Sequence, residues 1–238
     1  MRNLKILVII PARGGSKGIP MKNIQKLNGK PLITYSINAA KNSKYVNRII
    51  VSTENEKIAK ISKNLGVEVI PRPKYLSNDA TATIDVIKHL LKTLSKKENY
   101  SPSIVTILQP TLPLRDNKLV DKSIKQLIKS ESDIVLGVKK IKTHPFRAFW
   151  LRGKYLKPIN DNFLKFHQRQ LLPDCYITTG AIYTFWTKTL IKYNQMYGVK
   201  IKPLIISDDA INVDIDSKFD MFVNEMILKH WKLYSKKF

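Results

Sequence analysis

The sequence predicts an α/β protein with a mostly parallel sheet and helices on both of its faces. Along most of the 238 residues, apolar runs of strand length alternate with amphipathic stretches of helix length. The strand runs are rich in β-branched residues and are bounded by turn residues. Strands that alternate with helices in this way form parallel units whose helices cover the sheet.

The alternation is regular from the first strand, expected over residues 4–10, to residue 138. It continues through helix 31–43, strand 46–52, helix 54–66, strand 67–70, helix 83–97, strand 103–109, helix 117–130 and strand 133–138. Pro31 favours a helix start and Gly66 a helix stop.

From about residue 140 to 175 this rhythm breaks, which predicts an insertion within a single domain spanning 1–238. HPFRAFWLRGKYLKPI indicates a hairpin that turns at Arg152-Gly153, and a polar connector follows it. The pattern then resumes with strands 176–185, 203–207 and 211–216 and a closing helix from about 217 to 234.

The composition is that of an ordinary globular protein. It is 43% hydrophobic and 25% charged, and no apolar run is long enough to span a membrane. The opening MRNLKILVII is too short for a secretory signal, and the single cysteine, Cys175, excludes an intramolecular disulfide. We therefore expect a cytoplasmic protein without membrane partners.

The net charge of +24 suggests nucleic acid, an anionic surface or a polyanionic small substrate as partner. Lysines are spread along nearly every segment, which favours a solvated surface over a specific nucleic-acid interface. Only eight of the 42 basic residues are arginines, and five of these fall in or beside expected loops, where they can bind phosphate or carboxylate. They are Arg13, Arg72, Arg115, Arg147 and Arg169.

The stretch IPARGGSKGIPMKN follows the first expected strand and therefore lies at the carboxyl edge of the sheet, where open α/β sheets bind ligands. The amides of Gly14 and Gly15 can contact phosphate oxygens, and Arg13, Lys17 and Lys22 add three cations. The stretch matches neither a P-loop nor the dinucleotide motif. It predicts a triphosphate site, the alternative being a flexible basic turn.

Asp214-Ile215-Asp216 places two carboxylates on one face of the expected strand 211–216. Such a pair repels unless a cation lies between its members, and Mg²⁺ bound by carboxylates and substrate phosphates is the usual cation. Alternatively, Asp216 only caps the final helix.

Six motifs together resemble the acylneuraminate cytidylyltransferases, which make CMP-linked nine-carbon sugars such as sialic acid. In chain order they are IPARGGSKGIPMKN, LQPTLPLR, HPFR, QRQLLP, GAIY and VDIDSKFD, and the match runs from Ile10 to about Asp220. Kdo cytidylyltransferases share the opening but typically carry Arg where Gly18 stands.

The resemblance implies a Rossmann-like nucleotidyltransferase fold and a reaction in which a sugar hydroxyl attacks the α-phosphate of CTP, with Mg²⁺ as cofactor and pyrophosphate as leaving group. The nucleotide would be bound by Arg13, Gly14, Gly15, Ser16, Lys17, Lys22, Asn23 and Arg72. The implied catalytic residues are Arg13, Lys22, Asp214 and Asp216, the last two as metal ligands. Gln109 would orient the sugar, and Arg147 and Arg169 would receive its carboxylate.

The resemblance also implies a homodimer whose inserted segment reaches the partner's site. Thr179 stands where sialic acid enzymes commonly have Asn, so N-acetylneuraminic, legionaminic and pseudaminic acids all remain candidate substrates. A Kdo-type cytidylyltransferase is one alternative, and a non-enzymatic nucleic-acid-binding protein is another.

Overall fold

The computed structural model describes residues 4–161, 165 and 168–234. Its centre is a seven-stranded sheet in the order β11-β7-β10-β6-β1-β4-β5. The strands are β1 (Ile6–Pro11), β4 (Arg48–Thr53), β5 (Glu68–Pro71), β6 (Ile104–Ile107), β7 (Ile134–Lys140), β10 (Tyr176–Trp186) and β11 (Ile201–Ile205). All neighbouring pairs are parallel except those of β10 with β6 and β7, so the predicted fold class is confirmed.

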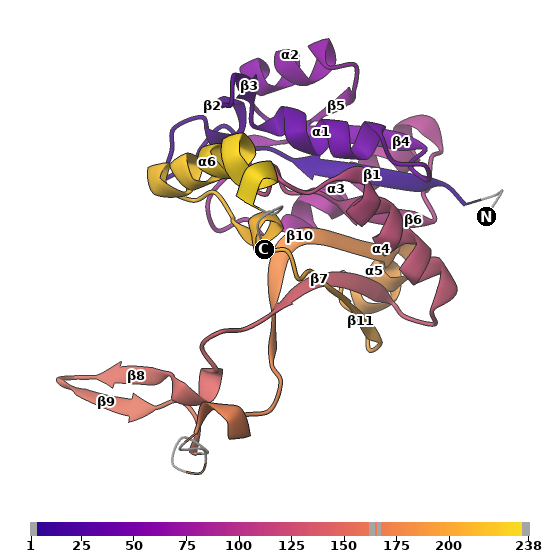
Figure 1. Ribbon diagram of the computed structural model, residues 1–238. Helices are drawn as coiled ribbons and strands as arrows, with labels where there is room; N and C mark the ends of the chain where they lie inside the picture. Colours follow the sequence, from indigo (N-terminus) through magenta and orange to yellow (C-terminus); the bar gives the residue numbers. More distant parts are fainter. Residues whose placement is uncertain (1–3, 162–164, 166–167, 235–238) are drawn as a thin grey trace.

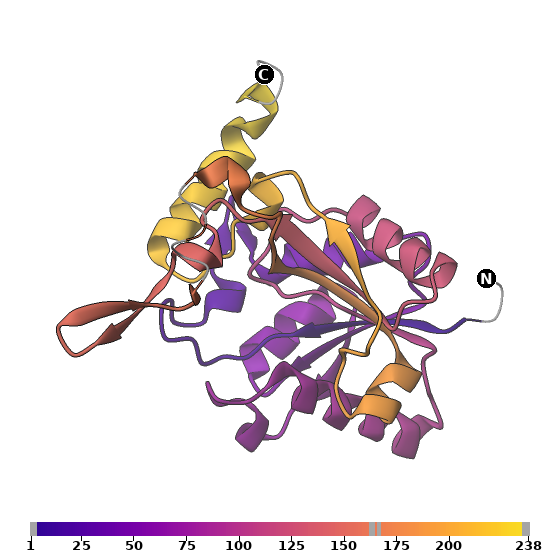
Figure 2. The same ribbon diagram turned by 90° about the horizontal axis from the view of Figure 1, so that it is seen from below.

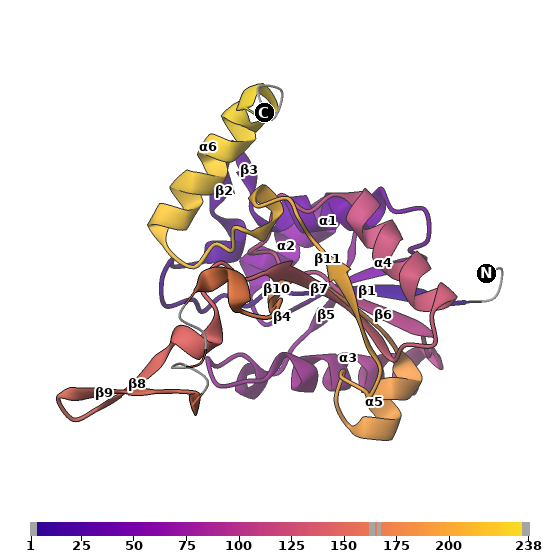
Figure 3. The ribbon, with the colours of Figure 1, turned by 60° about the horizontal axis from the view of Figure 1, so that its bottom comes forward.

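Alternate residues of β1 pack into two hydrophobic layers, one on each face of the sheet. Ile6, Val8 and Ile10 pack with α1 (Ile33–Lys41), α2 (Glu56–Asn64) and α4 (Asn117–Lys129). Leu7 and Ile9 pack with α3 (Thr83–Glu98) and α5 (Thr187–Tyr193) on the opposite face (Figure 3). Both faces of the central strand are buried, which is why its sequence is a continuous apolar run.

Several elements differ from the expectation. Helix α5 and the small strands β2 (Lys26–Leu27) and β3 (Lys30–Pro31) were not expected. The antiparallel direction of β10 fits its connection, because β7 and β10 are adjacent in the sheet and the described residues between them form a hairpin and short 3-10 helices, not a crossover helix.

The expected strand 211–216 is wrong. A short helix, η6 (Ala210–Asn212), is followed by irregular backbone outside the sheet. The Ile215 amide donates to the carbonyl oxygen of Thr111 in the loop after β6 (2.9 Å), not to a neighbouring strand. The final helix is present as α6 (Lys218–Tyr234).

The segment between β7 and β10 forms an arm that projects away from the sheet and its helices (Figures 1 and 2). It contains η3 (Pro145–Arg147), the hairpin strands β8 (Phe149–Arg152) and β9 (Tyr155–Pro158), and η5 (Arg169–Leu171). The hairpin turns after Arg152, where Gly153 has a φ of 61°. No helix in the described residues is long and apolar enough to cross a membrane.

Candidate active site

A cavity of about 280 Å³ opens at the carboxyl edge of the sheet. It collects the loops that follow β1, β5 and β6 and the segment before α6. Nine of the residues expected at the site line it: Arg13, Gly15, Ser16, Lys22, Asn23, Arg72, Gln109, Asp214 and Asp216. Residues separated by about 200 positions in the chain therefore meet at one site.

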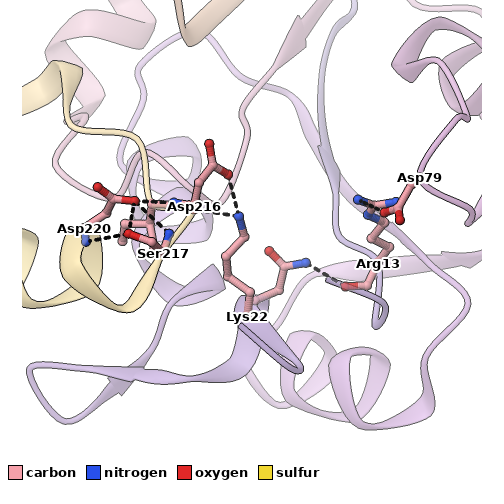
Figure 4. Close-up of polar contacts among 8 residues, drawn as sticks. Arg13, Lys22, Asp79, Asp216, Ser217 and Asp220 are labelled. Atoms are coloured by element: carbon pink, nitrogen blue, oxygen red, sulfur yellow. Dashed lines mark hydrogen bonds and ion pairs between the residues drawn. The ribbon is translucent and has the colours of Figure 1, made fainter. Parts of the chain in front are cut away.

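The loop after β1 carries two cations that share one carboxylate. Arg13 Nη2 lies 2.7 Å from a carboxylate oxygen of Asp79, in the loop that follows β5 (Figure 4). Lys17 Nζ lies 3.2 Å from the other carboxylate oxygen of Asp79. Lys17 and Arg13 hold the pKa of the Asp79 carboxyl below its usual value. Lys17 itself is exposed and does not line the cavity, in contrast to Arg13.

Gly14 supplies a backbone amide, which donates to Glu54 Oε1 (2.6 Å) at the end of β4. Glu54 Oε2 also lies 3.3 Å from Nη2 of Arg72, a side chain that is only 5% exposed. The Nε of Arg72 has no hydrogen-bond partner among the described residues. Burial lowers the pKa of the Arg72 guanidinium, Glu54 opposes this shift, and the charge of Arg13 adds to it. A buried, incompletely paired cation on the cavity wall is suited to bind a phosphate.

Lys22 lines the cavity and reaches from the first loop to the segment before α6. Its Nζ donates to the carbonyl oxygen of Ile215 (2.6 Å) and to Asp216 Oδ1 (2.9 Å) (Figure 4). The next residue, Asn23, is buried and donates from Nδ2 to the carbonyl oxygen of Arg13 (2.8 Å). Asn23 thus fixes the loop backbone that carries Arg13.

Asp214 and Asp216 flank Ile215, whose side chain is fully buried with Ile19, Leu27 and Leu32. Anchoring by Ile215, in place of a strand, leaves both carboxylates at the cavity. Desolvation raises the pKa of Asp214, a hydrogen bond from Thr111 lowers it, and the charge of Asp216 raises it further. A divalent cation between the two carboxylates would offset the repulsion that Asp216 exerts on the Asp214 carboxylate.

Asp216 does not cap α6. Ser217 Oγ accepts from the Asp220 amide (3.3 Å), and Asp220 Oδ2 accepts from the Ser217 amide (2.7 Å) and the Asp216 amide (3.0 Å). This is the reciprocal arrangement of a capping box. It orients the Asp216 backbone while its carboxylate stays available to the cavity.

Gly18 brings the first loop into direct contact with the carboxylate segment. A Cβ at this position would overlap the carbonyl oxygen of Asp216. The chain therefore has no room here for the arginine that is typical of Kdo cytidylyltransferases.

Arg147 lies elsewhere, in a second cavity of about 400 Å³ at the base of the arm. His144 and Lys142 line the same cavity. Arg169 begins η5, but its side chain lies outside the described part of the structure. The structure therefore separates Arg147 from Gln109, although both were expected to contact the sugar.

Sequence reasoning missed Glu54 and Asp79, the acidic partners of the expected cations. Glu54 had a usable signal, because it follows a buried parallel strand and so had to lie at the carboxyl edge. Asp79 follows a segment that contains only the short helix η2 (Lys74–Leu76), and no sequence pattern there relates it to the first loop. Among the described residues, no group of three or more His, Cys, Asp or Glu side chains could hold a metal ion. A metal at Asp214 and Asp216 would thus need further oxygens from substrate and water.

The mostly parallel sheet, with a cavity at its carboxyl edge lined by cations and paired carboxylates, is suited to a phosphorylated ligand, and a family model identifies the chain as a nucleotidyltransferase. The model for cytidylyltransferases matches residues 7–205, and the chain belongs to this family.

Similar proteins extend this result. The chain is 34% identical, over 98% of its length and 99% of the relative's, to post-translational flagellin modification protein B of Campylobacter coli. It is 32% identical to the CMP-N,N'-diacetyllegionaminic acid synthase of Legionella pneumophila, covering 95% of this chain and 97% of that one. The fold resembles that of a CMP:2-keto-3-deoxy-manno-octonic acid synthetase solved with CTP (TM-score 0.70, 16% identity, 95% of this chain and 99% of that chain).

Proposed function

We propose that this protein transfers CMP from CTP to the hydroxyl of a nine-carbon 2-keto sugar acid and releases pyrophosphate. The observation that carries the proposal is the single cavity that joins the first loop, Arg72, Gln109 and the two aspartates. The relative that is named as a CMP-N,N'-diacetyllegionaminic acid synthase supports a nine-carbon acid, and legionaminic acid in particular. Gly18, which leaves no space for a side chain, argues against the Kdo alternative.

The triphosphate would be bound by charge and by backbone amides. Arg13, Lys17 and Arg72 would exchange their carboxylate partners for phosphate oxygens, a stronger interaction because a phosphate carries more charge. Lys22 would bind the α-phosphate and counter the charge that develops during attack. Positioning and electrostatics would supply most of the catalysis, as is usual in phosphoryl transfer.

Asp214 and Asp216 would hold Mg²⁺ together with phosphate oxygens. When bound, the ion would polarise the reacting phosphate and screen the pyrophosphate leaving group. Asp216 would release Lys22 on doing so, which leaves the Lys22 ammonium available to the nucleotide. Gln109, on the cavity wall, would orient the sugar.

We also propose a homodimer in which the arm completes the partner's sugar site. Cross-strand partners on a hairpin share a face, so Phe149, Leu151, Leu156 and Pro158 form one apolar face of the arm. Leu151 and Leu156 are 72% and 65% exposed in the single chain. Arg147 lines a different cavity from Gln109, and in the proposed dimer the Arg147 of one copy would contact the sugar that the Gln109 of the other copy orients.

The test is pyrophosphate release by the purified protein with CTP and Mg²⁺. The acceptors are N-acetylneuraminic, legionaminic and pseudaminic acids and Kdo, and ATP, GTP and UTP serve as nucleotide controls. We expect release with CTP and a nine-carbon acid, and none without Mg²⁺. The proposal would be overturned if, of the four acids, only Kdo gave pyrophosphate release. It would also be overturned if a folded protein released pyrophosphate with none of them.

A further inference from the structure

Arg115 is buried directly behind Gln109. Its side chain is 3% exposed, and it does not line the cavity formed by the described residues. Nη1 donates to the carbonyl oxygen of Ala181 on β10 (2.6 Å), and Nη2 donates to Ser36 Oγ on α1 (2.5 Å) and to the carbonyl oxygen of Gln109 (3.1 Å). The sequence grouped Arg115 with arginines that bind a ligand, but its hydrogen bonds go to protein oxygens.

These contacts determine how Gln109 enters the cavity. Its carbonyl oxygen is held by Arg115 and also accepts from Ser36 Oγ (3.3 Å). Its side-chain Oε1 lies against Gly180, where a Cβ would be 2.9 Å away and where φ is 75°. Gly180 precedes Ala181, so one guanidinium holds both the residue that carries the amide and the strand against which the amide packs.

The charge of Arg115 is not compensated by a carboxylate within the described residues. All three hydrogen bonds end on neutral oxygens, and Nε has no hydrogen-bond partner in the part of the chain that the structure describes. Burial lowers the pKa of Arg115 to about 9, which leaves the side chain protonated at neutral pH. A buried, unpaired charge is a costly way to join three elements, since apolar packing would do so at less cost. The feature of Arg115 that needs an explanation is therefore the direction of its hydrogen bonds, which stability alone does not require.

We propose that Arg115 is a positioning residue for the sugar acid: by holding the Gln109 carbonyl and the Gly180-Ala181 backbone together, it sets the direction of the Gln109 amide in the cavity. This inference rests on the proposed function, in which Gln109 orients the sugar.

Steady-state kinetics of Arg115→Met and Arg115→Lys test it. Arg115→Met removes the hydrogen bonds at similar volume, and we expect KM for the sugar acid to rise about tenfold while KM for CTP changes less than about twofold. Arg115→Lys keeps a charged donor and should restore part of the loss. In Gly180→Ala the added Cβ would push the same amide from the opposite side. KM for the sugar acid should again rise while KM for CTP stays nearly unchanged.

Thr184→Val is the matched control. Thr184 is fully buried in the same sheet and bonds to Thr106 and Ser123, away from Gln109. Thr184→Val should lower the melting temperature and leave the ratio of KM for the sugar acid to KM for CTP unchanged. If Arg115→Met lowers stability in the same way and leaves the sugar KM unchanged, the residue is only structural and the proposal is wrong.

A double-mutant comparison tests whether Arg115 acts through Gln109. In a Gln109→Ala background, Arg115→Met should change the sugar KM by less than about twofold further, because the amide it positions is gone. Full additivity of the two effects would contradict the proposal.

A spectroscopic measurement separates this inference from the proposed function. The side-chain amide resonance of Gln109 in the ligand-free protein, assigned with Gln109→Glu, should shift in Arg115→Lys and Gly180→Ala but not in Thr184→Val. If the wild type uses no sugar acid, the proposed function fails and this shift still decides the positioning role. An unmoved resonance in Arg115→Lys overturns it.

Discussion

At the carboxyl edge of the sheet, each cation of the first loop has a carboxylate partner from the same chain, whereas the arm exposes a face of apolar side chains. Arg13 and Lys17 contact Asp79, and Lys22 contacts Asp216. On the arm, Leu151 and Leu156 face solvent, and no other described residue covers them. The charges of the first loop are therefore paired within the chain before any ligand is bound. The arm has the character of a surface that needs another molecule.

The largest expected effect tests the edge at its carboxylate pair. Asp216→Ala removes one proposed metal ligand and the partner of Lys22, and we expect kcat to fall by about 10²- to 10³-fold, as for loss of a group that stabilises transition-state charge. Pyrophosphate release at saturating CTP and Mg²⁺ measures it. Glu131→Ala, an exposed carboxylate paired with Lys200 away from the cavity, is the control and should be fully active. Near-normal turnover by Asp216→Ala would show that Asp216 is not a ligand of a catalytic metal ion.

The second prediction tests whether the apolar face of the arm stabilises the proposed dimer. Leu151→Asp combined with Leu156→Asp places two charges on the apolar face. Since a buried leucine contributes about 1.5 to 3 kcal/mol, the dimer dissociation constant should rise by at least about hundredfold. Light scattering after size exclusion reads the mass, and activity should fall with it.

The control for the arm is Ile191→Asp on α5, where Ile191 is 79% exposed. It adds a charge at an equally exposed apolar residue away from the arm and should leave the dimer intact. A wild-type monomer that is fully active would show that the arm has another purpose.

The third prediction concerns the contact that joins the two parts of the edge. Gly18→Ala would force the Asp216 carbonyl away, at a cost of about 1 to 3 kcal/mol in stability and with reduced turnover. Gly15→Ala has no atom within 4 Å of its added Cβ and should alter the free energy of unfolding by less than about 0.5 kcal/mol. Chemical unfolding compares the two. Equal stabilities would mean that the loop adjusts freely.

The smallest effect is expected at the exposed ion pairs of the first loop. Asp79→Asn removes a carboxylate that competes with phosphate for Arg13 and Lys17, so KM for CTP should decrease by a small factor. Because Lys17 and Arg13 lower the pKa of Asp79, its carboxylate is ionised throughout the neutral range. The difference from wild type should therefore stay constant there and disappear only in acid, as Asp79 itself takes up a proton. Asp85→Asn, an exposed residue outside the cavity, is the control, and a raised KM in Asp79→Asn would mean that Asp79 helps to bind the nucleotide.

The sequence by itself determined the alternating α/β class, the position of the first loop at the carboxyl edge and the place of the arm. Each follows from local periodicity, because the side-chain spacing of a strand or helix reports which face is buried. The pairing of Asp214 and Asp216 was also predicted, although through a strand that does not form. Burial of Ile215 between them gives the alternation instead.

Only the tertiary structure decided which charges meet. Lys22 and Asp216 are 194 residues apart, and no local pattern relates them. The same holds for Arg115, a loop arginine in the sequence and a buried link between α1, β10 and Gln109 in the fold, and for Arg147, which lies in a cavity of its own. Periodicity is a property of neighbouring residues, whereas a site depends on how distant elements pack, and only the folded chain determines that.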